Sequence, residues 1–524
     1  MESDVLMSDF SRTPASTTTS AWPERIEPLD DVAELARVQA LISAGPFDET
    51  WESLSAYTVP KWFRDAKFGI FLHWGAYTVP AFGNEWYPRN MYVEGTPEFE
   101  HHRATYGSQT DFGYKDFLPN FKAERWDPVD WAGLFQRAGA QFVVPVAEHH
   151  DGYAMYRTDR SRWNSTRIGP HRDLVGDLAQ AVRDRWLVLG VSSHRAEHWF
   201  FMNGGTAFPS DVTDPDFSDF YGPAQREELS PNDGYLIDWF LRTVELIDRY
   251  RPQVLWFDWW IEQPVFKPWL RKLAAYYYNV AAQWGREVVI QYKWDAFEPG
   301  TAVLDLERGA MASIHAAVWQ NDTSIARTSW SWIPDHRYKS LPELIAELVD
   351  VVAKNGVLLL NIGPLADGTI ANEERDLLTG IGDWLRVNGQ AIYGANPWVV
   401  ASEGPTVEID GSFIDAEERR FTASDIRFTT QERYGNARIY ATLLAWPADG
   451  VARIEAFGSA AGYLDRPIHA VDLLGYPGEV EWRQGPNSLE VVLPKTPPSA
   501  VGAVIRLTTE PAGESRRLPF DHQL

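Results

Sequence analysis

The chain of 524 residues contains no cysteine. This absence excludes disulfide bonds, zinc sites built on thiolates and cysteine nucleophiles, although it does not fix the cellular compartment. Long apolar runs are missing too, since no stretch of about 18 residues is apolar enough to cross a membrane. The first twenty residues lack the basic and apolar segments of a secretory signal, so we expect a cytoplasmic protein.

Positive charge is scarce in this chain. The 48 Lys and Arg residues are outnumbered by 73 Asp and Glu residues, which gives a formal net charge of -25. A surface of this sign repels the phosphates of nucleic acids and the headgroups of anionic membranes, so neither is expected as a partner. A neutral or cationic ligand is compatible with this charge, and so is a homo-oligomer of the chain.

Aromatic residues, in contrast, are abundant. Trp, Tyr and Phe together make up 14% of the chain, and Trp residues cluster in otherwise polar segments such as 256–260 and 330–332. Aromatic rings pack in hydrophobic cores, and they also stack on the C–H faces of sugars because they combine an apolar body with a polar edge. Core packing and saccharide binding both remain open from composition alone.

The pattern of apolar residues divides the chain into three regions. Residues 1–54 comprise a Ser-rich and Thr-rich tail and a leader helix at 30–43. In residues 55–396, short apolar runs alternate with helical patterns, which is typical of buried parallel strands joined by helices. Residues 397–524 show short alternating runs broken by Gly, Pro and Asp. We expect a (β/α)8-like TIM-type catalytic barrel and a C-terminal all-β sandwich that packs on its side rather than over its mouth.

Eight apolar runs match the number of strands that a closed barrel requires. The segment between the fifth and seventh runs is too short for full helices, so the barrel is expected to be irregular there. The eight predicted strands are 68–74, 142–148, 186–193, 254–258, 287–292, 302–307, 317–320 and 357–362.

Polar residues follow most of these strands, at the end where barrel enzymes place their reacting groups. Such a rim suits either a metal site or a pair of carboxylates that cleaves a glycoside. The adjacent His149 and His150 would point to opposite sides of an extended chain, and no HExxH pattern occurs. We therefore favour paired carboxylates and expect no metal and no cofactor. The residues at the strand ends are His73, His149, His150, His194, Asp258, Glu307 and Trp319.

Each of these residues also has a simpler structural interpretation, and position alone does not decide between the two. A carboxylate after a strand can cap the next helix, and a histidine in an apolar segment can be part of the core. The simpler interpretations are an N-cap for Asp258, core histidines for His73 and His194, loop residues for His149 and His150, an ion pair of Glu307 with Arg308, and a solvated loop acid for Glu85.

Four long segments resemble the α-L-fucosidases of glycoside hydrolase family 29. They span about residues 60 to 396 in the family's order, and motifs of this length are specific. The resemblance implies a retaining, exo-acting enzyme that removes terminal α-L-fucose from oligosaccharides or glycoconjugates. The segments are WFRDAKFGIFLHWGAYTVPAFGNEWYPRNMY, WAGLFQRAGAQFVVPVAEHHDGYAMY, RPQVLWFDWW and KNGVLLLNIGPLADGTIANEERDLLTGIGDWLRVNGQAIYG.

The same resemblance implies roles for individual residues. Asp258 in LWFDWW matches the family's nucleophile. One of Trp256, Trp259 and Trp260 is expected to form an apolar wall for the fucose methyl group. The implied sugar contacts are His73, Glu85, Trp86, His149, His150 and Trp256.

The chain departs from the commoner family pattern in three places. His194 stands where many members have a sugar-contacting Tyr-Tyr-Ser run, and it is expected to substitute for the tyrosine. Lys293 stands where many members have the arginine of an Asn-Asp-Arg run. It keeps the positive charge of that arginine but not its bidentate geometry. Trp319 is followed by Gln320 instead of glutamate, and an amide cannot protonate a leaving group. This loss leaves two alternatives open: a catalytically weak fucose-binding protein, or an enzyme for a related sugar such as an α-galactoside.

Three carboxylates compete for the role of general acid and base: Glu307, Asp322 and Glu298. Glu307 is preferred because it ends an apolar run, where partial burial favours a protonated carboxyl. The resemblance supports the same choice, because some family members carry their acid in the corresponding segment. The long insert 202–230 follows the third strand, so we expect it to influence the choice of aglycone.

Overall fold

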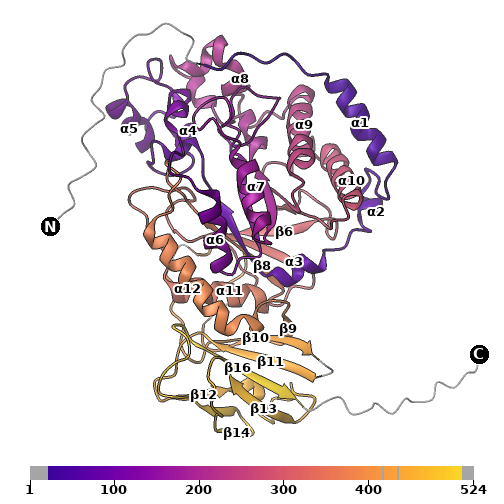
Figure 1. The fold of residues 1–524 in the computed structure, drawn as a ribbon, viewed down its shortest axis with the longest axis vertical. Helices are drawn as coiled ribbons and strands as arrows, with labels where there is room; N and C mark the ends of the chain where they lie inside the picture. Colours follow the sequence, from indigo (N-terminus) through magenta and orange to yellow (C-terminus); the bar gives the residue numbers. More distant parts are fainter. Residues whose placement is uncertain (1–21, 407–408, 416–417, 434–435, 510–524) are drawn as a thin grey trace, which may run out of the picture.

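The computed structural model describes residues 22–406, 409–415, 418–433 and 436–509. Most of the predicted N-terminal tail lies outside these ranges. A large helix-covered unit is joined to a smaller β unit, and α11 and α12 lie between the two (Figure 1). No helix within the described ranges is long and apolar enough to cross a membrane.

Eight parallel strands form a closed barrel in chain order, and β1 pairs with β8 to close it. The predicted (β/α)8-like fold is therefore confirmed. Segments 293–302 and 308–318 contain turns but no helix, as expected for the irregular part of the barrel. The strands are β1 (Phe68–Leu72), β2 (Phe142–Glu148), β3 (Val188–Ser193), β4 (Val254–Phe257), β5 (Val289–Tyr292), β6 (Val303–Glu307), β7 (Trp319–Ser324) and β8 (Gly356–Ile362).

Helices cover the outside of the barrel, and their ends follow local sequence signals. The side chain of Asp127 accepts hydrogen bonds from the first turn of α6, and a proline follows at the first helical position. The larger helices are α1 (Asp31–Ser43), α6 (Pro128–Arg137), α7 (Leu174–Asp184), α9 (Asp233–Tyr250), α10 (Lys267–Gln283), α11 (Leu341–Ala353) and α12 (Asn372–Asn388). The shorter helices are α2 (Trp51–Leu54), α3 (Lys61–Ala66), α4 (Tyr87–Asn90), α5 (Pro97–Thr105) and α8 (Ser218–Tyr221).

The C-terminal region is a two-sheet antiparallel domain, as predicted. One sheet has the order β13-β16-β11-β10-β9 and the other β12-β15-β14, and apolar side chains from both sheets form a separate core. The strands are β9 (Asn396–Glu403), β10 (Ile426–Arg433), β11 (Asn436–Leu443), β12 (Val451–Ile454), β13 (Ile468–Leu473), β14 (Trp482–Gln484), β15 (Leu489–Val492) and β16 (Ala503–Thr509).

This domain packs on the side of the barrel, against α11 and α12 (Figure 1). The indole of Trp384 donates a hydrogen bond to the carbonyl of Val501 at 3.0 Å. One part of the prediction is wrong, however. Residues 409–415, between β9 and β10, lie at the barrel rim, where Gly411 forms a β-bridge with Ala310 and where Ser412 and Phe413 line the cavity. The C-terminal domain therefore also contributes to the mouth of the barrel.

Candidate active site

A cavity of about 880 Å³ opens at the carboxyl ends of the barrel strands. Ten of the eleven predicted site residues line it, although they come from segments that span more than 230 positions of the chain. The fold therefore brings together six of the seven residues that the strand-end argument grouped and four that the family resemblance added. These ten residues are His73, Glu85, Trp86, His149, His150, His194, Trp256, Asp258, Lys293 and Glu307.

Asp258 follows β4 and lies at the centre of this arrangement. One carboxylate oxygen accepts a hydrogen bond from Nδ1 of His194 at 3.0 Å and lies 3.4 Å from Nε2 of His150. The other accepts from the Lys293 ammonium at 3.0 Å and from the backbone N–H of Trp259 at 2.8 Å. Asp258 is no helix N-cap, because the next helix, α10, begins only at Lys267.

The surroundings of Asp258 keep it ionised. Burial alone would raise the pKa of its carboxyl. The Lys293 ammonium and the hydrogen bonds from His150 and His194 outweigh burial and hold that pKa well below its ordinary value. A carboxylate that stays charged at all moderately acidic and neutral pH values suits the role of a nucleophile.

Lys293 connects the two predicted catalytic carboxylates. Its Nζ lies 3.0 Å from Asp258 and 2.5 Å from Oε2 of Glu307. Burial would lower the pKa of Lys293, but Asp258, Asp322 and Glu307 together raise it well above its ordinary value. The lysine is therefore a permanent cation between two acids. Arg308 does not pair with Glu307, since it binds Asp415 instead at 3.1 Å.

Four buried histidines form one wall of the cavity. His73 donates from Nδ1 to Oδ1 of Asn361 at 2.8 Å, and the amide of Asn361 donates in turn to the carbonyl of Trp330. This chain of contacts fixes the tautomer of His73 and leaves Nε2 as an acceptor. Burial lowers the pKa of His194 to about 4 and that of His73 well below its ordinary value. Both rings are neutral at physiological pH.

The expectation that His149 and His150 point to opposite sides is wrong. β2 ends at Glu148 and the chain turns there, so both rings reach the cavity, with ring centroids 4.2 Å apart. Two groups of side chains could each hold a metal ion: His73, His149 and His194, and separately His150, His194 and Asp258. The two adjacent histidines belong to different groups, so they do not form one chelate.

Glu85 is not a solvated loop acid. It is buried, and one carboxylate oxygen accepts from the backbone N–H of Trp330 at 2.9 Å and from the hydroxyl of Ser329 at 3.1 Å. Burial nevertheless raises the pKa of Glu85 above its ordinary value. The ring of the next residue, Trp86, packs against His150 with centroids 5.4 Å apart. These contacts fix the loop after β1 over the cavity.

A polar layer inside the barrel lies under the cavity. Gln320 donates to Asp305 at 2.9 Å and accepts from Gln291, while the indole of Trp256 donates to the other oxygen of Asp305 at 2.8 Å. Gln320 does not line the cavity. Asp322 lies two residues after Gln320, on the same face of β7, and it does line the cavity. Burial and the neighbouring Asp305 raise the pKa of Asp322 well above its ordinary value.

Three predicted contributors do not reach the cavity. Trp319 begins β7 at the opposite end of the barrel, and its indole donates to the carbonyl of Lys354 at 2.9 Å. The predicted seventh strand ended at Gln320, whereas the observed strand continues to Ser324. Glu298 is exposed, and no residue of the insert 202–230 lines the cavity. Trp319 thus serves the core, and the insert forms no part of the cavity wall.

Comparison with known proteins agrees with this geometry. Residues 34–390 match the family described as alpha-L-fucosidase, and residues 419–508 match the alpha-L-fucosidase C-terminal domain. The chain belongs to the α-L-fucosidase family. It is therefore a glycoside hydrolase by descent, with both domains of the family present.

Individual relatives cover most of this α-L-fucosidase family chain. The tissue alpha-L-fucosidase of Homo sapiens is 32% identical over 476 residues, covering 88% of this chain and 91% of that protein. That of Mus musculus is 31% identical and covers 87% and 92%. The crystal structure of Thermotoga maritima alpha-fucosidase in complex with fucose is similar with a TM-score of 0.70 and 31% identity, covering 88% of this chain and 100% of that one.

Several side chains of this fucosidase-family site were not predicted from the sequence. Asn361 belongs to the apolar run of β8 and carries no signal of its own, yet it orients His73. Glu197 is fully buried, with Oε2 3.2 Å from Nδ1 of His150. Trp294 and Phe413 lie in irregular segments and line the outer part of the cavity. Among these residues, only Trp294 had a sequence signal, because it directly follows the predicted site residue Lys293.

A buried acid near this site is expected to make the stability of the protein depend on pH. Glu374 of α12 is fully buried and accepts one hydrogen bond, from the N–H of Gly363 at 3.2 Å. Burial raises its pKa from 4.5 to about 8. The folded state thus retains a proton that the unfolded state loses, so the stabilisation is complete below pH 4.5 and declines as pH rises toward about 8.

We expect Glu374→Gln, which carries no titrating group, to remove this decline. Between pH 5 and 8 the wild type should lose about 1.4 kcal/mol of unfolding free energy per pH unit relative to the variant. Urea unfolding of both proteins across this range measures the difference. The exposed Asp376 on the same helix provides the control, because Asp376→Asn should follow the wild type. Parallel curves for wild type and Glu374→Gln would contradict the argument.

Proposed function

We propose that this protein is a retaining, exo-acting α-L-fucosidase that hydrolyses terminal α-L-fucosides by double displacement. The observation that supports this most is the ammonium of Lys293 between Asp258 and Glu307. Its Nζ lies 3.0 Å from an oxygen of Asp258 and 2.5 Å from an oxygen of Glu307, so these two oxygens are at most about 5.5 Å apart. That upper limit agrees with the separation of about 5 to 5.5 Å between the carboxyl groups of retaining glycosidases.

In the first step Asp258 attacks the anomeric carbon of the fucoside. Glu307 transfers its proton to the glycosidic oxygen, the bond between that oxygen and the anomeric carbon breaks, and the aglycone leaves as an alcohol. The sugar remains bound to Asp258 as an ester of inverted configuration. The low pKa of Asp258 supplies the ionised nucleophile that this step needs.

In the second step water hydrolyses the ester. Glu307, now a carboxylate, takes a proton from water as the water oxygen attacks the anomeric carbon, and Asp258 leaves as a carboxylate. Two inversions give α-L-fucose. Lys293 faces both acids, so it stabilises whichever of them carries the negative charge in each step.

The remaining residues bind and orient the sugar. The neutral ring of His73, whose Nε2 remains an acceptor, offers a hydrogen bond to a sugar hydroxyl group without adding charge. The ring nitrogens of His194 are engaged by Asp258 and Ser192, so His194 orients the nucleophile. Trp256 and Trp259, which line the cavity, offer the apolar surface that the methyl group of a deoxy sugar requires. A fucosylated oligosaccharide is the proposed substrate, and none of these steps requires a metal ion.

Release of nitrophenol from an aryl α-L-fucoside tests this proposal. We expect turnover that survives a chelator, and NMR of early time points should show α-L-fucose as the first product. A protein that binds fucose without turnover would indicate a sugar-binding protein. Faster cleavage of the aryl α-galactoside would indicate another sugar, and β-fucose as the first product would exclude double displacement.

A further inference from the structure

Residues 409–415, which belong to the C-terminal domain in the sequence, lie at the rim of the barrel beside Glu307. The backbone N–H of Phe413 donates to the carbonyl of Glu307 at 2.9 Å, and that of Ile414 donates to the carbonyl of Arg308 at 2.9 Å. Gly411 and Ala310 exchange two further backbone hydrogen bonds of 3.0 Å. The segment therefore continues the edge formed by the end of β6 and places Phe413 directly next to Glu307.

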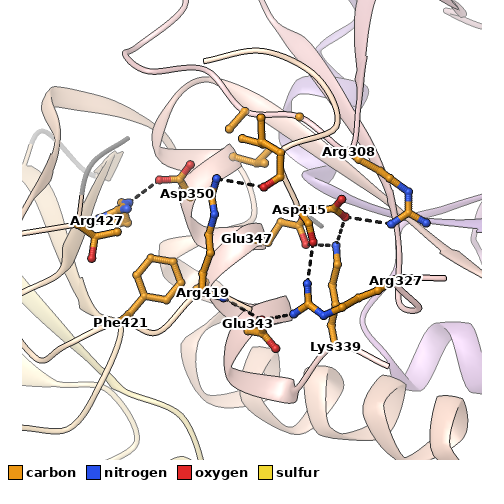
Figure 2. Close-up of a pocket in the computed structure, with 16 residues that line it drawn as sticks. Arg308, Arg327, Lys339, Glu343, Glu347, Asp350, Asp415, Arg419, Phe421 and Arg427 are labelled. Carbon is orange, nitrogen blue, oxygen red and sulfur yellow. Dashed lines mark hydrogen bonds and ion pairs between the residues drawn. The ribbon is translucent and has the colours of Figure 1, made fainter. Parts of the chain in front are cut away.

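A charged cluster anchors this segment. The carboxylate of Asp415 accepts from Lys339 at 2.6 Å and from Arg308 at 3.1 Å (Figure 2). It also accepts from the hydroxyl of Thr323 at 3.0 Å. Burial would raise the pKa of Asp415, but Lys339 and Arg308 outweigh it and keep the pKa below its ordinary value. Asp415 thus holds a fixed charge between cations of the barrel, only two residues from Phe413.

Phe413 is held in an orientation that exposes its ring. It lines the cavity, yet 61% of its surface is accessible to solvent. Its backbone has φ 56°, a left-handed conformation that a bulky residue adopts only where the surrounding contacts impose it. Trp294, which follows Lys293, repeats this combination with 69% exposure and φ 63°, and it lines the same cavity.

We propose that Phe413, together with Trp294, forms the subsite for the leaving group, and that its occupant is the pyranose ring linked to the fucose. This inference rests on the proposed function. The aglycone oxygen must face Glu307, which protonates it, and Phe413 is hydrogen-bonded to Glu307 through the backbone. An exposed aromatic ring offers an apolar face to the C–H face of a sugar. The occupant is thus a sugar rather than a charged group.

Two substrates separate this subsite from the fucose subsite. α-L-Fucosyl fluoride has a leaving group with no ring and little need of an acid, whereas an α-L-fucosyl disaccharide fills both subsites. We expect Phe413→Ala to lower kcat/KM about tenfold for the disaccharide that the wild type cleaves fastest, mainly through KM, and to leave the fluoride within about twofold. Phe413→Trp should retain near wild-type activity on both.

Two further variants complete the design. Phe413→Gly relieves the left-handed backbone but also lacks the ring, so it should match Phe413→Ala if the ring matters. Trp186 is the matched control, because it is 92% exposed with φ 61° but precedes β3, at the barrel end opposite the cavity. Trp186→Ala should behave as the wild type.

Equal loss on both substrates, or an unchanged disaccharide rate in Phe413→Ala, would overturn the subsite. A wild type that cleaves neither substrate would instead overturn the proposed function. The two failures are therefore distinguishable.

Discussion

Asp258→Ala is expected to lower kcat at least about a thousandfold on every fucoside, because it removes the proposed nucleophile of the covalent step. The loss should not depend on the leaving group, since no substrate avoids the attack on the anomeric carbon. Steady-state kinetics on an aryl fucoside measures it. Asp295, an exposed acid in the loop after β5, is the control, and Asp295→Ala should retain wild-type rates.

Azide gives a sharper form of this experiment. A small anion can enter the space that the carboxylate leaves in Asp258→Ala and attack the same face of the sugar. Partial recovery of the rate with β-fucosyl azide as the product would identify both the missing group and its position. Near-native activity of Asp258→Ala without azide would assign the nucleophile to another residue.

Glu307→Ala is expected to show a large effect that depends on the leaving group. Removal of a general acid typically costs about a hundredfold to ten-thousandfold when the departing oxygen needs a proton. Fucosyl oligosaccharides should suffer this loss, whereas a dinitrophenyl fucoside, whose phenolate leaves unaided, should be cleaved with a near-native first step. Comparison of kcat/KM for the two substrates gives the result.

Asp322 and Glu298 are the matched carboxylates for this test. Asp322 lines the cavity next to Glu307 on the neighbouring strand, at the same level of the barrel. Glu298 is exposed and lies outside the cavity, so Glu298→Ala should have no effect. Selective loss in Asp322→Ala instead of Glu307→Ala would move the acid to β7, and equal loss of both substrates in Glu307→Ala would indicate a structural role.

The barrel was predictable because most of its strands are short, buried apolar runs. The strand ends then located the site, since parallel strands of a barrel place their carboxyl ends on one rim. The error at β7 shows where this reasoning stops. Only its first residue, Trp319, is apolar, and the buried polar residues Asn321, Asp322 and Thr323 continue the strand toward the cavity. A polar strand interior leaves no alternation to detect.

Two other features, the orientation of a pair of side chains and a contact between the two domains, were not predictable for a different reason. The orientation of His149 and His150 depends on a turn that begins one residue before them, and a one-residue change in strand length reverses the side on which a residue points. The approach of Phe413 to Glu307 depends on the packing of a whole domain. Sequence periodicity describes a single element, so neither contact had a local signal.

The bridge between Gly411 and Ala310, described above as part of the fold, means that the C-terminal domain is more than a scaffold. Exchanging this domain between relatives, or trimming the chain after the barrel, would also replace or remove the wall beside Glu307, the proposed proton donor. Homologues that share every barrel residue can therefore diverge in the glycans they prefer through changes more than a hundred positions downstream of Glu307. A search for the origin of such preferences should begin at the junction of the two domains.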